Sequence, residues 1–189
     1  MIRIAVVGDI GSGKSHVAKR FGFPVFNADL EVTKIYKTNK KCFNKIRRAL
    51  PKYIYNFPIK KNEITKAILV NKINLKKIIK IIHPEVRKSM NKFLVKNKTK
   101  KIIILDIPLL LENKINKKGD ILIFVDSKKN EVNKRLKKRK DFNIKIHKKF
   151  KKIQLPLEFK KKKSKFIIKN NFSNKSLRKS IKRIIRKII

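Results

Sequence analysis

One segment near the start of the chain has the residue types and the spacing of a phosphate-binding loop. It reads GDIGSGKS over residues 8–15 and fits the pattern GxxxxGK[ST]. Glycines let the backbone turn sharply and bring N–H groups close to phosphate oxygens, where any Cβ would intrude. Three of the five glycines in the chain fall in this segment, so a chance turn before a lysine explains it poorly.

The loop predicts contacts to ATP and to a magnesium ion. The helix that starts near Gly13 would point the positive end of its dipole at an anion. Lys14 would supply a charge to the β and γ phosphate oxygens, and the Ser15 hydroxyl can bind Mg²⁺. His16 either touches a phosphate or faces solvent, and no NKxD-type segment that would read guanine is found. The predicted nucleotide-binding residues are Gly11, Ser12, Gly13, Lys14, Ser15 and His16.

Two aspartates are placed where the substrates of a kinase would lie. Carboxylates are scarce, with 12 Asp and Glu in total, and ligands of parallel α/β sheets bind beyond the carboxyl ends of strands. Asp29 follows the apolar segment 25–27 and could orient or deprotonate an acceptor hydroxyl, or else cap a helix that begins near Leu30. Asp106 ends the apolar segment 101–106 and either reaches the magnesium shell or belongs to a turn.

Arginines are the side chains that suit a migrating phosphoryl group, because the guanidinium is planar and always charged. Arg135 and Arg139 are four residues apart on a predicted helix, so they share a face. Arg139 borders a polar break at 139–143 that could close as a lid, and the alternative is a solvated basic side chain. Glu112 is expected to cap or orient neighbouring groups.

The charge of the chain is extreme, with 55 Lys and Arg and a formal net charge of +43. Such a charge suggests a nucleic acid or an anionic membrane, but the lysines are spread along the whole sequence, which favours compositional drift. The lysine runs at 137–140 and 160–163 are predicted to be solvated helix faces. Cys42 is the single cysteine, so no internal disulfide forms, and we interpret it as a small apolar core residue. With neither an apolar stretch of about 18 residues nor a cleavable signal, we expect a cytoplasmic protein.

Short apolar strands alternating with helices would position these residues. Strands are predicted at 1–7, 25–27, 101–106, 120–126 and 166–169. Helices are predicted at 14–21, 128–138, 144–163 and 176–189, with a mostly helical stretch at 30–95 broken at Pro51, Pro58 and Pro84. Strands separated by helices imply an α/β fold with a parallel five-stranded sheet flanked by helices.

The predicted elements indicate one domain over residues 1–189. Its core comprises 1–29 and 100–189, a helical acceptor-binding insertion covers about 30–99, and a lid covers about 139–155. Whether the chain is a monomer or a homo-oligomer stays open at this point.

Several segments, taken in order, resemble the dephospho-CoA kinase family almost from end to end. The phosphate loop alone is shared by many families, and the combination with the later segments is more particular. The segments are IGSGKS at 10–15, NAD at 27–29, HPEV at 83–86, DIPLLLE at 106–112, VDSKKNEVNKRLKKR at 125–139, Gln154, and IIKNN at 167–171.

The resemblance implies a nucleoside-kinase-like P-loop NTPase fold with a helical acceptor-binding part and a lid. It also implies ATP-dependent phosphorylation of the ribose 3′-hydroxyl of dephospho-CoA, the last step of coenzyme A synthesis. By the same matching, Asp29 corresponds to the active-site carboxylate, Arg139 to a lid arginine, and Asn170 or Asn171 lies near the adenine. Asp9 stands where the family usually has a second glycine.

The predicted catalytic residues are therefore Lys14, Asp29 and Arg139, and the predicted magnesium ligands are Ser15 and Asp106. One alternative is another small-molecule P-loop kinase of the nucleoside monophosphate or shikimate type. The other is an RNA-binding protein with a vestigial nucleotide fold, which would need aromatic residues at base-stacking spacing, and few are placed that way. We expect dephospho-CoA as partner, no specific nucleic acid and no membrane, with nonspecific polyanion binding as a consequence of the charge.

Overall fold

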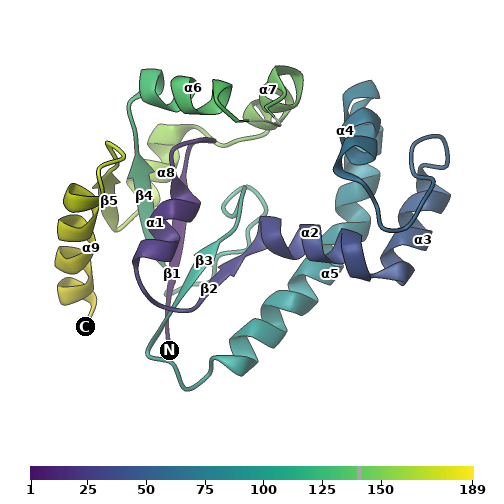
Figure 1. The fold of residues 1–189 in the computed structure, drawn as a ribbon. Coiled ribbons are helices and arrows are strands. Elements are labelled where there is room, and N and C mark those ends of the chain that lie inside the picture. The colour runs from purple at the N-terminus through teal and green to yellow at the C-terminus, as the bar shows by residue number, and fades with distance from the viewer. Residues whose placement is uncertain (140–141) are drawn as a thin grey trace. The chain divides into compact units, whose positions relative to one another are not determined.

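A computed structural model describes the chain from Met1 to Ile189 except residues 140 and 141 (Figure 1). Those two residues belong to the predicted lid, so this part of the lid lies outside the described residues. The chain forms two compact units. The first, here called the core unit, comprises Met1–Asn27 and Asn97–Ile189, and the second, the helical unit, comprises Ala28–Lys96.

A five-stranded parallel sheet forms the centre of the core unit, which confirms the predicted fold class. The strand order is β2-β3-β1-β4-β5, so β1 lies in the middle. Every residue of β3 is buried, as expected for an apolar, β-branched strand in a sheet with both faces covered. The strands are β1 (Ile2–Gly8), β2 (Val25–Asn27), β3 (Ile102–Asp106), β4 (Ile121–Asp126) and β5 (Phe166–Lys169).

Helices cover this sheet and place the loops at its carboxyl edge. The helices of the core unit are α1 (Lys14–Arg20), α6 (Lys129–Lys137), α7 (Ile144–Lys152), α8 (Leu157–Lys163) and α9 (Asn174–Ile188). The apolar side of α9 packs with α1 on alternate strand residues such as Ile4 and Val6, as the helical spacing of Leu177, Ile181 and Ile184 predicts. Helix α8 contacts β1 and β4.

The prediction of one helix over 144–163 is wrong. Helix α7 ends at Lys152 and α8 begins at Leu157, with residues 153–156 between them. Pro156 occupies the N-cap position of α8. A proline disfavours helical geometry in the residue before it but fits the start of a helix, so Pro156 explains both the break and the restart.

Four helices make up the helical unit. They are α2 (Ala28–Thr38), α3 (Lys40–Ala49), α4 (Lys61–Val70) and α5 (Lys72–Lys96). Helices α2, α3 and α4 each pack against α5. The buried side chains include Ile35, Phe43, Ile46, Ile78 and Ile82. The helical unit therefore has an apolar core of its own.

The predicted break at Pro84 is also wrong, whereas the breaks at Pro51 and Pro58 are confirmed. Residues 50–60 contain no α-helix, but Pro84 lies inside α5, which continues to Lys96. A proline inside a helix removes one main-chain hydrogen bond. Packing of α5 against its three neighbours supplies the stabilisation that local propensity lacks.

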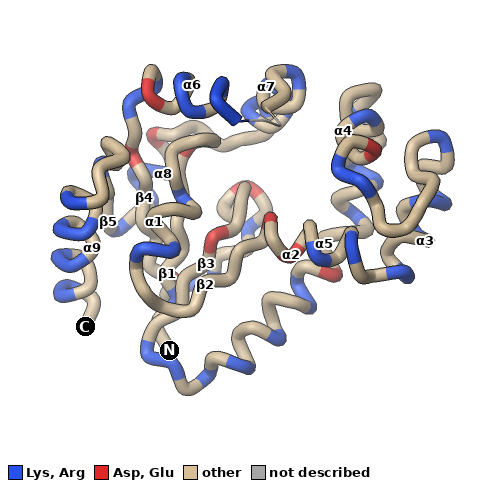
Figure 2. Tube along the Cα trace, viewed as in Figure 1, with Lys and Arg blue, Asp and Glu red and all other residues tan. Residues whose placement is uncertain are grey.

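Basic residues are distributed over nearly all helices rather than collected in one arm (Figure 2). Along α9 the lysines and arginines alternate with the buried Leu177, Ile181 and Ile184, so they occupy the side turned away from the sheet. Within the part of the chain that the structure describes, no helix combines the length and the apolar character that a membrane span requires.

Candidate active site

The phosphate loop connects the central strand β1 directly to α1, and its glycines are required by the backbone. Gly8, Gly11 and Gly13 all have positive φ, at 147°, 86° and 90°. A Cβ on Gly13 would lie 2.5 Å from the side-chain nitrogen of Asn170, and one on Gly8 would lie 2.7 Å from a main-chain oxygen of β4. Only glycine therefore satisfies both the conformation and the space at these positions.

Two neighbouring loops form hydrogen bonds to the middle of the phosphate loop. The main-chain oxygen of Ser12 accepts hydrogen bonds from the Ser127 hydroxyl and from the side-chain nitrogen of Asn170, each at 2.9 Å. Ser127 follows β4 and Asn170 follows β5, so the carboxyl ends of both strands contribute. Asn170 was placed near the adenine by resemblance, and its observed contact is with the loop.

Several N–H groups of the loop are available for an anion. Among the described residues, the main-chain N–H groups of Gly11, Gly13 and Ser15 donate no hydrogen bond. The first turn of α1 carries no acidic side chain, and its N-cap makes no side-chain hydrogen bond. N–H donors left without a partner at the start of a helix suit the oxygens of a nucleotide's terminal phosphates, so the loop fits the group that its sequence predicts.

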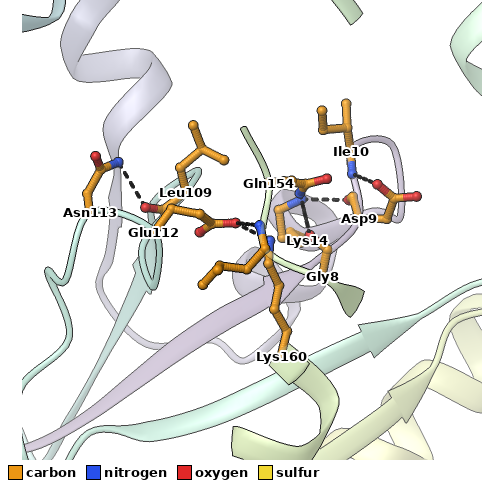
Figure 3. A network of polar contacts seen from close by, with 10 residues as sticks. Gly8, Asp9, Ile10, Lys14, Leu109, Glu112, Asn113, Gln154 and Lys160 are labelled. Carbon is orange, nitrogen blue, oxygen red and sulfur yellow. Dashed lines mark hydrogen bonds and ion pairs between the residues drawn. The ribbon is translucent and has the colours of Figure 1, made fainter. Parts of the chain in front are cut away.

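The ammonium group of Lys14 is turned back onto the loop itself (Figure 3). Its Nζ donates to the main-chain oxygen of Asp9 at 2.7 Å and to that of Gly8 at 3.3 Å. These carbonyl oxygens carry partial negative charge, and phosphate oxygens are stronger acceptors. A phosphate bound in the loop would therefore compete with these carbonyl oxygens for the Lys14 ammonium.

Asp106 ends β3 and pairs with a residue that the sequence did not single out as functional. Asp106 is 2% exposed, and its carboxylate accepts a hydrogen bond from the side-chain amide of Asn27. The two are register partners on β2 and β3, so the parallel pairing itself brings them together. No group of three His, Cys, Asp or Glu side chains gathers at a metal-binding distance among the described residues. Magnesium commonly takes only one or two protein ligands beside phosphates and waters, so Ser15 with Asp106 remains a fitting set.

The surroundings of Asp29 differ from those expected, whereas His16 is solvent-exposed, which was one of its two predicted alternatives. Asp29 is exposed and is the second residue of α2, so the alternative that it precedes and caps a helix near Leu30 is wrong. It belongs to the helical unit. His16 is exposed on α1, where its Nε2 lies 3.2 Å from the side-chain oxygen of Asn174 on α9.

The two arginines of the predicted shared face differ in their contacts. The guanidinium carbon of Arg135 lies 4.2 Å from the centre of the Phe172 ring, which is a cation–π geometry. Phe172 adjoins the phosphate loop, because a Cβ on Gly13 would lie 3.3 Å from its ring. Arg139 is exposed just beyond α6 and donates its main-chain N–H to Leu136.

The structure contains a buried ion pair between Lys160 and Glu112 that was not predicted. Lys160 Nζ lies 2.6 Å from the Glu112 carboxylate, and the two side chains are 3% and 9% exposed (Figure 3). Glu112 also accepts from the main-chain N–H of Leu155 at 3.0 Å, which confirms its expected orienting role. The prediction that the run 160–163 is entirely solvated is wrong at Lys160, because nothing in four consecutive lysines marks which one faces inward.

The helical unit contains titratable groups whose pKa values are shifted by burial. Burial raises the pKa of the Cys42 thiol to about 11, with a further contribution from the Glu85 carboxylate. Burial likewise raises the pKa of Tyr36. Burial lowers the pKa of His83, and the charge of Arg87 lowers it further. Cys42 is 3% exposed, in agreement with its interpretation as a core residue.

A five-stranded parallel sheet in the order β2-β3-β1-β4-β5, with a glycine-rich loop between its central strand and α1, defines a P-loop kinase. A family model described as dephospho-CoA kinase matches residues 2–176. The chain belongs to the dephospho-CoA kinase family, which consists of ATP-dependent phosphotransferases.

Individual relatives agree with this assignment, and solved structures agree with the fold. A protein of Wolbachia pipientis wMel described as dephospho-CoA kinase is 32% identical over 187 residues, covering 96% of this chain and 95% of the relative. One from Fusobacterium nucleatum is 34% identical over 186 residues, covering 95% of each. A structure described as dephospho-CoA kinase from Campylobacter jejuni has a TM-score of 0.65 at 25% identity, covering 98% of this chain and 96% of the other. The Thermus thermophilus protein TT1252, at 23% identity and a TM-score of 0.81 over 100% of this chain and 98% of its own, supports the fold.

Proposed function

We propose that this chain transfers the γ-phosphate of ATP to the ribose 3′-hydroxyl of dephospho-CoA, giving coenzyme A and ADP. The observation that carries the proposal is the phosphate loop, with free N–H donors and Lys14 beside it, in a chain that its family model matches over residues 2–176. The cytoplasm is the proposed location.

Lys14 binds the β and γ phosphate oxygens in the proposed reaction. Its ammonium exchanges the main-chain oxygens of Gly8 and Asp9 for phosphate oxygens when ATP enters the loop. The N–H groups of Gly11, Gly13 and Ser15 complete the cradle. These donors stabilise the negative charge that spreads over the transferred group.

Ser15, through its hydroxyl, and Asp106, through its carboxylate, would hold the magnesium ion in this proposal. The ion would supply positive charge against the phosphate oxygens. The hydrogen bond from Asn27 keeps the Asp106 carboxylate in one orientation, which limits the positions that an ion beside it can adopt.

Asp29 acts as the base and Arg139 as the lid cation. The acceptor oxygen attacks the γ-phosphorus in line as the bond to the β–γ bridging oxygen breaks, and Asp29 takes the proton of the hydroxyl. We assign acceptor binding to the helical unit and closure to the lid at 139–155. No covalent enzyme intermediate is needed.

A coupled ADP-release assay tests the proposal directly. ATP with Mg²⁺ is offered together with dephospho-CoA, UMP, dAMP or shikimate, and ADP formation is followed. We expect turnover with dephospho-CoA at least about a hundred-fold above that with the others. Turnover with another acceptor alone would assign the chain to a different P-loop kinase activity. RNA binding with strong sequence preference and no kinase activity would favour the binding-protein alternative.

A further inference from the structure

Asp9 uses its side chain to connect the phosphate loop to a distant segment. Its Oδ1 accepts from the main-chain N–H of Ile10 at 2.7 Å. The side-chain amide of Gln154, from residues 153–156 between α7 and α8, lies against the same stretch of loop (Figure 3). Asp9 is not among the residues with positive φ, so a side chain at this position costs no backbone strain.

The neighbours of Gln154 determine which way its amide points. With the amide nitrogen toward the loop carbonyl of Gly8, at 3.3 Å, its oxygen faces the Asp9 carboxylate and its nitrogen also faces the Lys160 ammonium. In the exchanged orientation the nitrogen donates to Asp9 Oδ1 at 3.1 Å and the oxygen accepts from Lys160 Nζ at 3.2 Å. A carboxylate only accepts and an ammonium only donates, so the exchanged orientation is the one that satisfies every group.

Four side chains are then linked in series, and we call them the polar chain: Glu112, Lys160, Gln154 and Asp9. Glu112 anchors one end, because it holds both the Lys160 ammonium at 2.6 Å and the main-chain N–H of Leu155 at 3.0 Å. A buried ammonium needs a hydrogen-bond partner for each of its protons, and Gln154 supplies one. The buried pair therefore fixes the Gln154 amide, and Gln154 fixes the side chain of Asp9.

At the loop end of the polar chain lies the catalytic lysine. Lys14 donates to the main-chain oxygen of Asp9, whereas Gln154 donates to the side-chain carboxylate of Asp9. The main-chain contact is the one that Lys14 gives up when it turns to a phosphate. The side-chain contact does not depend on Lys14, so it can hold the first half of the loop in place during that exchange.

We propose that Gln154 and Lys160 are positioning residues that keep residues 8–10 of the phosphate loop in the nucleotide-binding conformation through the side chain of Asp9. The proposal rests on the proposed function in taking a nucleotide as the ligand. A loop that is ordered before the nucleotide arrives loses less conformational entropy on binding, so the polar chain increases nucleotide affinity. Acceptor binding does not use these contacts.

The test exchanges the carboxylate and the amide between positions 9 and 154. Gln154→Glu places two carboxylates together and breaks the link. The double variant Asp9→Asn with Gln154→Glu restores it, because the new amide donates to the new carboxylate, which still accepts from Lys160. Lys162→Met removes an exposed charge from the same helix as Lys160 and is the matched control.

Two measurements on the full chain report on the link. Calorimetry gives the Kd of MgADP, and hydrogen exchange of the free protein gives the protection of residues 8–13. We expect Gln154→Glu to weaken MgADP about tenfold and to speed exchange in the loop, since a hydrogen bond to a charged group is lost. The double variant returns both values toward wild type, and Lys162→Met changes neither.

The outcomes separate this inference from the proposed function. Unchanged MgADP affinity in Gln154→Glu, or no recovery in the double variant with an unchanged Tm, overturns the positioning role. An equal loss in the KM for dephospho-CoA also overturns it, because that pattern indicates general damage to the fold. If the exchange pattern holds while wild-type protein fails to phosphorylate dephospho-CoA, the positioning role stands and the proposed function falls.

Discussion

The side-chain amide of Asn27 donates to the carboxylate of Asp106, and the two residues are register partners at the ends of β2 and β3. This contact gives the buried Asp106 carboxylate an uncharged hydrogen-bond donor. Asp106 ends β3, which lies next to β1, the strand that leads into the phosphate loop. The contact also orients the group that we propose as part of the magnesium shell.

Asn27→Ala leaves the buried Asp106 carboxylate without this donor. We expect the free energy of unfolding to fall by about 1–3 kcal/mol, the usual cost of an unsatisfied buried polar group. Urea denaturation followed by circular dichroism measures it. Asn130→Ala, at an exposed position of α6, serves as control and should change stability by no more than about 0.5 kcal/mol. Equal stability of both variants would show that the Asn27 contact contributes nothing.

Lys14→Ala removes the charge that we assign to the transferred phosphoryl group. We expect kcat to fall by a factor of about 10² or more, since one preorganised charge contact to a transition state is lost. The circular dichroism spectrum and Tm should stay unchanged. Lys19→Ala removes an exposed lysine from the same helix, and its kcat should equal that of wild type. A Lys14→Ala enzyme with near-normal turnover contradicts the catalytic assignment.

Asp29→Asn tests the proposed base. The substitution keeps the size of the side chain but removes its ability to accept the acceptor's proton, so kcat should fall about 10²- to 10⁴-fold. The KM for ATP should change little, because the proposed role concerns the acceptor hydroxyl. Glu31→Gln, two residues further along α2, is the control in the same steady-state assay. If both variants keep wild-type kcat, the base lies elsewhere.

The lowered pKa of His83 predicts how the helical unit responds to acid. Burial and Arg87 keep the folded-state pKa below the ordinary value of 6.5, so the unfolded chain binds the proton more readily. Stability from this group is present above pH 6.5 and is lost as the pH falls through the folded-state pKa. Urea denaturation at pH 7.5 and 5.5 should show a smaller acid loss for His83→Gln than for wild type. An identical loss in both proteins would rule out this origin.

Cys42 should resist thiol reagents in the folded protein. Its thiol pKa of about 11 leaves very little thiolate at pH 8, and the residue is 3% exposed. Alkylation by iodoacetamide at pH 8, followed by mass spectrometry, should be at least about a hundred-fold slower in buffer than in 6 M guanidinium chloride, where the thiol is exposed. Comparable rates in the two solutions would show that Cys42 is accessible.

Strand positions were predictable to within one residue because buried parallel strands are short, apolar and rich in β-branched residues. The phosphate loop was predictable because its glycines have a steric purpose that the structure bears out at Gly8 and Gly13. Both signals are local in the sequence. The helix break before Pro156 was also visible in the sequence, since the proline itself is the signal.

The polar chain was not predictable from the sequence. Gln154 and Asp9 are 145 residues apart, and no local pattern links them. Lys160 is buried because α8 packs against β1 and β4 and Glu112 pairs with it, and these are tertiary contacts that a run of identical lysines does not reveal. Similarly, α5 continues through Pro84 because of its neighbours and against its own propensity.

The strand order has a consequence for synthesis on the ribosome. Strands β1 and β2 are the first two to emerge, and they do not pair with each other. Strand β1 pairs with β3 and β4, and β2 pairs with β3. The nascent chain must therefore carry two apolar, unpaired segments until residues beyond Ile102 have left the exit tunnel. The contiguous segment Ala28–Lys96 can meanwhile bury its own side chains, so translation would complete that part first and the sheet last.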